Sequence, residues 1–153
     1  MAGKTSAQDK DVETKIEVIA RDILTAIKAM RPPSIASPVR SLSNVEFDHK
    51  HGYFRIGASE KKRTLTAATV KTFAQTLRMM GLSKELITTD DTATKREAYY
   101  VSKNWGDARF KEQHESDSVM DDIEAMLRVN REQMGFIPGE HGGAVAGQLV
   151  VID

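Results

Sequence analysis

The chain has 153 residues, of which 40% are hydrophobic and 29% charged, which suits one domain with a packed core. It has no cysteine and no apolar run of about eighteen residues, so disulfides, thiolate metal sites and a membrane-spanning helix are excluded. Residues 1–15 lack the apolar stretch of a secretory signal, and we expect a cytoplasmic protein.

A net charge of zero conceals two oppositely charged blocks. Residues 50–111 contain thirteen Lys or Arg against six Asp or Glu, whereas residues 112–132 contain seven Asp or Glu against two Arg. The basic block favours a polyanionic partner, because cations close to phosphates release counterions. The alternative is a solvated surface whose charge is balanced by the acidic block.

The N-terminal third predicts a tail, a helix and a connector. Residues 1–11 are polar and expected to be disordered. Residues 12–31 predict an amphipathic helix that ends before two prolines, and residues 34–38 a connector. The apolar stripe of this helix favours core or dimer packing, and it consists of Val12, Ile16, Ile19, Ile23, Ile27 and Met30.

The next segment predicts a β-hairpin and then helices. Residues 45–47 and 53–56 are expected to pair, with Gly52 in the turn, and to be followed by a polar loop over 57–63. A helix is predicted to begin at Thr64 or Thr66 and to end at Gly81. Residues 82–88 then predict a short helix.

The C-terminal half predicts two further helices and a second hairpin. Residues 90–92 are expected to cap a helix that ends near Trp105, and Ser116 or Asp117 to cap the next. The second hairpin is predicted to join residues 134–137 to 144–152, with a glycine-rich tip. Three helices followed by a hairpin is the order of a winged helix-turn-helix. The predicted class is therefore α+β, mostly helical, with a small antiparallel sheet and an extra N-terminal helix.

Two adjacent tyrosines follow an arginine in the predicted helix that ends near Trp105. Residues four apart share a helical face, so Arg96 and Tyr100 are expected to point the same way. A phenol beside a guanidinium suits chemistry on a phosphodiester, because an unassisted phenol is a poor nucleophile at neutral pH. The alternative places Tyr99 in the core and Tyr100 on a basic surface without a catalytic role.

Candidate metal ligands are few. The four histidines show no HxxxH or HExxH spacing, and His49 and His51 flank a predicted turn. Glu115 and Asp117 are possible ligands, but negative charge at a helix N-terminus is the favoured interpretation. No metal site is predicted within the chain.

Several motifs, in this order, resemble the A subunit of archaeal type IIB DNA topoisomerases (DNA topoisomerase VI), a family related to the meiotic double-strand-break transesterase. The resemblance covers residues 38–152. It rests on Arg40-Ser41-Leu42-Ser43-Asn44-Val45, Phe73-Ala74-Gln75-Thr76-Leu77, Thr94-Lys95-Arg96-Glu97-Ala98-Tyr99-Tyr100, Glu112-Gln113-His114-Glu115-Ser116-Asp117 and the segment from Ile137-Pro138 to Gly147.

The resemblance implies a function and its partners. Residues 38–153 would be a CAP-like winged-helix domain in which Tyr100 attacks DNA to form a 5′-phosphotyrosyl double-strand break, assisted by Arg96. The family's second domain, a Toprim domain that holds Mg²⁺, has no counterpart in these 153 residues. An A subunit of this kind forms a homodimer and joins an ATP-dependent B subunit in an A2B2 assembly. In an archaeal cell this places the protein at the nucleoid, and the chain alone is expected not to cleave DNA.

A set of polar residues is predicted to contact the DNA backbone. It consists of Lys71, Lys95, Arg96, Ser102, Lys103, Arg109 and, in the second hairpin, His141. Tyr99 and Trp105 are expected to pack in the interior. The alternative function is a winged-helix DNA-binding regulator that uses the same surface without chemistry. A third hypothesis is a dimerisation module in which residues 12–30 pair with a partner.

Overall fold

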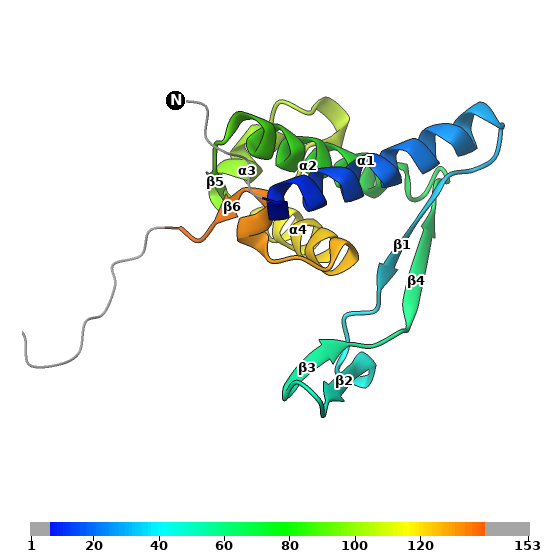
Figure 1. Cartoon of the computed structure of the whole chain (residues 1–153). Coiled ribbons are helices and arrows are strands. Elements are labelled where there is room, and N and C mark those ends of the chain that lie inside the picture. The colour runs from blue at the N-terminus through cyan, green and yellow to red at the C-terminus, as the bar shows by residue number, and fades with distance from the viewer. Residues whose placement is uncertain (1–6, 140–153) are drawn as a thin grey trace, which may run out of the picture.

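The computed structural model describes residues 7–139, in which a helical body carries a projecting arm of β-strands (Figure 1). The strands are β1 (Ser34–Pro38), β2 (Val45–Asp48), β3 (Tyr53–Ile56), β4 (Glu60–Thr64), β5 (Ala93–Thr94) and β6 (Phe136–Ile137). The α-helices are α1 (Ala7–Lys28), α2 (Val70–Thr89), α3 (Lys95–Ser102) and α4 (Gln113–Leu127), and the short 3₁₀ helices are Leu42–Asn44, Gly106–Ala108 and Arg131–Met134. These elements confirm the α+β, mostly helical, winged-helix-like class. No helix in the described part is long and apolar enough to cross a membrane.

Helix α1 follows the predicted apolar spacing. Val12, Ile16 and Ile23 are buried against the other helices, and each contributes roughly 1.5–3 kcal/mol by leaving water. The helix begins at Ala7, five positions before Val12, so part of the predicted tail is helical. It ends at Lys28, before the two prolines, as expected.

Helix α2 is continuous where the sequence predicted two helices. Gly81 lies in its interior, because a glycine costs a helix only about 1 kcal/mol. The buried residues on either side, Met79, Met80, Leu86 and Ile87, stabilise the helix by more than that. The predicted start was also wrong, since α2 begins at Val70.

A two-residue parallel pairing fixes the start of α3. Strand β5 pairs with β6, so Ala93 lies opposite Phe136. The buried Ser83 hydroxyl of α2 donates to the Met134 carbonyl, 2.8 Å away, and holds β6 against the helical body. Gly135 has φ +81°, and a Cβ there would lie 2.8 Å from the Cβ of Leu86. Residues 134–137 thus pair with 93–94, and the second strand of the predicted hairpin, 144–152, lies outside the described residues.

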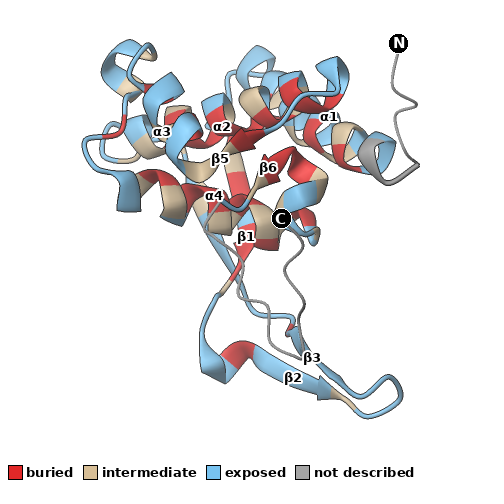
Figure 2. Cartoon of the chain, turned by 90° about the vertical axis from the view of Figure 1, so that its left-hand side faces the viewer, coloured by how far each residue is buried: buried red, intermediate tan, exposed pale blue. Residues whose placement is uncertain are grey.

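The arm consists of two antiparallel pairs joined end to end (Figure 2). Strand β1 pairs with β4, so the predicted connector over 34–38 and loop over 57–63 were wrong. Strands β2 and β3 form the predicted hairpin at the far end, with Gly52 in its turn. Cross-strand partners share a face, and one face of this hairpin is apolar and exposed to solvent. That face carries Val45, Phe47, Phe54 and Ile56.

One buried asparagine joins the two halves of the arm. The Asn44 amide nitrogen donates to the carbonyls of Val39 and Ser59, and its Oδ1 accepts from the Ser59 N–H at 3.0 Å. A Cβ on Gly57 would lie 2.7 Å from this Oδ1, so the joint requires glycine. Side chain and backbone together hold the β2–β3 hairpin at a fixed angle to β1–β4.

The base of the arm is attached to α4 by ion pairs. Asp122 accepts from Arg40 at 2.9 Å and from Lys61 at 3.3 Å, and lies 3.8 Å from Arg63. The acidic block therefore neutralises the arm's own cations, which is the alternative that the charge pattern left open. Helix α4 itself begins at Gln113 after Glu112, and not at the predicted caps. Its first turn includes Ser116, whose buried hydroxyl donates to the Gln113 carbonyl.

Candidate functional site

Helix α3 begins at a capping box. The Glu97 N–H donates to the Thr94 hydroxyl at 3.2 Å, and the Thr94 N–H donates to the Glu97 carboxylate at 2.7 Å. The predicted cap at residues 90–92 was wrong, because Asp90 ends α2 in a left-handed conformation. Accepting the Thr94 N–H lowers the pKa of Glu97 and keeps it charged at the positive end of the helix.

The helix turns Tyr100 outward. Ala98 and Ser102, four residues apart, are both fully buried and face the core. Residues 96 and 100 therefore lie on the opposite side, and Tyr100 is 53% exposed. The Arg96 Nη2 donates to the Tyr100 hydroxyl at 3.3 Å. The predicted juxtaposition of guanidinium and phenol on one exposed face is present.

This contact ties the guanidinium to the phenol. The Arg96 Cζ lies 5.7 Å from the centre of the Tyr100 ring. The hydrogen bond to the Tyr100 hydroxyl raises the pKa of Arg96, which is fully cationic at neutral pH in any case. An exposed phenolic oxygen beside a permanent cation can approach a phosphate, with the remaining guanidinium N–H groups free to bind its oxygens.

Tyr99 is held differently. Its hydroxyl donates to the Lys111 carbonyl at 2.9 Å and accepts from the Lys103 ammonium at 2.6 Å. Its ring packs against the main core, as does Trp105, whose ring lies 5.8 Å from Phe110. The two adjacent tyrosines therefore have different environments: the Tyr99 hydroxyl is bonded within the chain, and the Tyr100 hydroxyl faces solvent.

The predicted DNA contacts divide into three groups. Lys71, Lys95, Arg96 and Arg109 have exposed or half-buried side chains without an ion-pair partner within residues 10–139. Ser102 and Lys103 do not suit the role. The Ser102 side chain is fully buried and donates to the Tyr99 carbonyl, and the Lys103 ammonium is bonded to protein oxygens. His141 lies outside the described residues.

The described residues do not form a magnesium site. They contain no group of three Asp, Glu or His side chains that converge. Glu115 accepts the Lys111 N–H at 2.8 Å, which supports its predicted role at a helix N-terminus. The buried Asp117 Oδ1 has no hydrogen-bond partner in the described part, but one carboxylate is too few for Mg²⁺.

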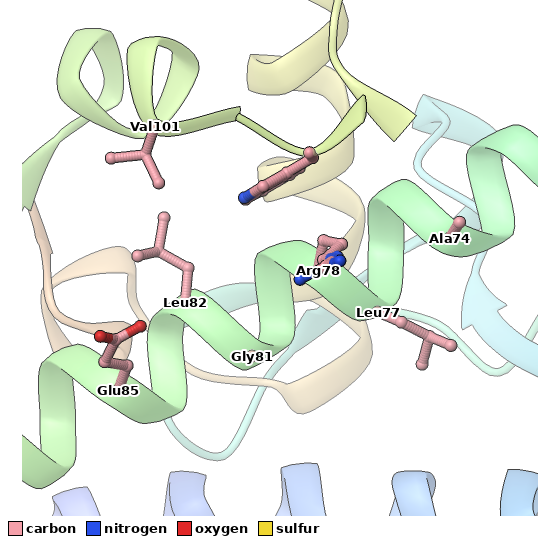
Figure 3. Close-up of a pocket in the computed structure, with 8 residues that line it drawn as sticks. Ala74, Leu77, Arg78, Gly81, Leu82, Glu85 and Val101 are labelled. Carbon is pink, nitrogen blue, oxygen red and sulfur yellow. The ribbon is translucent and has the colours of Figure 1, made fainter. Parts of the chain in front are cut away.

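A pocket lies between α2 and the end of α3 (Figure 3). Arg78, Leu82 and Glu85 of α2 face Val101 of α3 across it. Neither Tyr100 nor Arg96 lines this pocket, so the tyrosine–arginine pair is a surface site and is separate from it. An exposed pair suits a large substrate that approaches from outside.

Two features of the site were missed but can be read in the sequence. The Thr-x-x-Glu pattern of Thr94 and Glu97 is a capping-box signature. Lys103 lies four residues after Tyr99, a spacing that places their side chains together on a helix. By contrast, no local pattern announces that Asp122 collects the cations of the arm.

Comparison with known proteins identifies the family. The family described as type IIB DNA topoisomerase matches residues 71–136. Among curated relatives, all named as the A subunit of type 2 DNA topoisomerase 6, that of Methanocaldococcus jannaschii is 48% identical over 139 residues, covering 91% of this chain and 38% of the relative. That of Pyrococcus abyssi is 34% identical, covering 98% and 40%, and that of Methanosarcina barkeri is 30% identical, covering 100% and 42%. The chain spans about two fifths of the length of these relatives. It belongs to the family of type IIB DNA topoisomerase A subunits.

Proposed function

We propose that this chain carries the DNA-cleaving tyrosine of a type IIB topoisomerase and that this tyrosine is Tyr100. The observation that carries the proposal is the contrast within the tyrosine pair. The Tyr100 side chain is 53% exposed and its hydroxyl contacts Arg96, whereas two intramolecular bonds engage the Tyr99 hydroxyl. Only Tyr100 has a hydroxyl that is free to approach a phosphodiester.

The reaction is a transesterification. The Tyr100 oxygen forms a bond to phosphorus as the bond from phosphorus to the 3′ oxygen breaks. The phenolic proton leaves Tyr100, and the departing 3′ oxygen gains a proton. One phosphodiester replaces another, so the 5′-phosphotyrosyl linkage can be reversed by the 3′-hydroxyl and the strand resealed. Catalysis of such a step depends mainly on positioning and on stabilising charge at the phosphate oxygens.

Arg96 is the candidate for that stabilisation. One Nη already contacts the Tyr100 hydroxyl, and the planar guanidinium can present its other donors to the non-bridging oxygens. Lys71, Lys95 and Arg109 would hold the flanking phosphates without reading base sequence. The role predicted for His141 stays a prediction.

The remaining requirements lie outside this chain. Mg²⁺ would be held by a Toprim domain, since the described residues offer no converging carboxylates. ATP would be used by a B subunit, with two A and two B subunits working together on duplex DNA at the archaeal nucleoid. We therefore expect the chain alone to bind DNA without cleaving it.

A chimera provides the test. This sequence replaces the matching region of the M. jannaschii relative, to which it is 48% identical, and the product is combined with that organism's B subunit, ATP, Mg²⁺ and supercoiled DNA. Covalent adducts are trapped with detergent. We expect Tyr100→Phe to abolish the adduct and Tyr99→Phe to retain it, although formed more slowly.

Two results would contradict the proposal. An adduct that survives Tyr100→Phe and disappears with Tyr99→Phe would assign the chemistry to the other tyrosine. A chimera that binds DNA with unchanged affinity after Tyr100→Phe, and forms no adduct even before it, would favour the DNA-binding regulator.

A further inference from the structure

The loop between α3 and α4, residues 103–112, is tied to both helices through the Lys103 ammonium. This nitrogen donates to the Tyr99 hydroxyl at 2.6 Å and to the carbonyls of Phe110 at 2.8 Å and Lys111 at 3.3 Å. A lysine has three N–H donors, and all three have acceptors within the chain. The ammonium also lies 3.9 Å from the centre of the Tyr99 ring, close enough for a cation–π contact.

Other bonds extend this network to the neighbouring helices. The Tyr99 hydroxyl itself donates to the Lys111 carbonyl, and the Lys111 N–H donates to Glu115 of α4. On the opposite side, the Gln75 side chain of α2 donates to the Arg109 carbonyl at 3.4 Å. The loop is thus bonded to three helices, and Lys103 contributes more of these bonds than any other side chain in the network.

The length of α3 makes this network important. The helix has eight residues, about two turns, and a helix so short is not stable without tertiary contacts. Its N-terminus is fixed by the capping box, and its C-terminal end is fixed by Tyr99 and Lys103. Tyr100 lies between these two residues, so its position depends on the same contacts.

We infer that Lys103 is a positioning residue for the tyrosine reaction and does not contact DNA. It fixes Tyr99 and the α3–α4 loop, and it thereby holds the Tyr100–Arg96 pair in the geometry needed for in-line attack. The inference rests on the function proposed above for Tyr100. It replaces the prediction from sequence that Lys103 binds a DNA phosphate.

Lys103→Met distinguishes the two roles, because methionine retains most of the apolar stem but has no charge and no donor. A phosphate contact would contribute about 0.9 to the slope of log affinity against log salt concentration, and a positioning residue contributes nothing. In the chimera, we expect Lys103→Met to leave the salt slope and DNA affinity unchanged while lowering the single-turnover rate of adduct formation by about tenfold to a hundredfold. Lys62→Met, on the exposed arm strand β4, is the matched control and should change neither quantity.

A second readout does not require activity. Trp105 is the only tryptophan in the chain and lies inside this loop, so its fluorescence reports the loop's packing. In the chain alone, Lys103→Met should shift this emission and speed amide exchange over 103–112, and Tyr99→Phe should do the same to a smaller degree. If the chimera forms no adduct but the fluorescence still shifts, the proposed function fails and the role of Lys103 in the loop survives. A shallower salt slope, or an unchanged cleavage rate with unchanged fluorescence, would overturn the inference.

Discussion

Gly135→Ala tests how the short β5–β6 pairing supports the tyrosine helix. Gly135 has φ +81°, a conformation that costs an alanine about 1–2 kcal/mol. The added Cβ would lie 2.8 Å from the Cβ of Leu86, in a packed region where overfilling typically costs about 1–3 kcal/mol. The two effects act on the same atom, so we expect a total destabilisation of about 2–5 kcal/mol.

The assay is urea denaturation of the chain followed by circular dichroism. With a slope of about 1–3 kcal/mol per M, the midpoint should fall by roughly 1–3 M. Because the Ala93 N–H donates to the Gly135 carbonyl at 3.0 Å, amide exchange at residues 93–97 should also become faster. A stability loss without faster exchange there would mean that β6 does not support α3.

Gly81→Ala is the matched control. Gly81 lies inside α2, and a Cβ there would meet no atom within 4 Å. Alanine should therefore stabilise the chain by about 0.5–1 kcal/mol, since it removes only the conformational cost of glycine in a helix. Equal effects at both glycines, in either direction, would refute the reasoning, because it predicts opposite signs.

Two further predictions concern α3. In the chimera, Arg96→Ala should lower the rate of adduct formation by about a hundredfold or more, with partial recovery in Arg96→Lys, which keeps the charge without the planar fork; an unchanged rate would remove Arg96 from the mechanism. Glu97 has a pKa below its ordinary 4.5 in the folded chain because it accepts the Thr94 N–H, so its stabilising effect is present above pH 4.5 and is lost as the pH falls through the lowered value. The stability difference between the chain and Glu97→Gln should therefore shrink in acid, and a difference that stays constant across that range would contradict this role.

The sequence predicted those parts of the fold in which local pattern and packing agree. The α1 stripe, the β2–β3 hairpin and the outward face of α3 follow from helical and strand periodicity alone. Gly81 misled because a glycine can end a helix, and the decisive factor, burial of the residues on either side, is tertiary. The β1–β4 pair was missed because Ser34–Pro38 and Glu60–Thr64 lack alternating apolar residues.

The candidate site was predictable to the same extent. The spacing of Arg96 and Tyr100 placed both on one face, which the structure bears out. The sequence could not reveal that Ser102 turns inward or that the Lys103 donors are occupied, because their partners include backbone carbonyls of a loop with no regular pattern. A lysine near a tyrosine pair resembles a phosphate ligand until its acceptors are known.

The joint of the arm constrains how this sequence can vary. Because the asparagine carbonyl at position 44 occupies the space that a side chain at position 57 would need, neither site can change freely while the other stays fixed. A shorter residue at 44 would admit alanine at 57 but would leave the backbone groups of Val39 and Ser59 without partners. Variants of the arm should therefore alter both positions at once or neither.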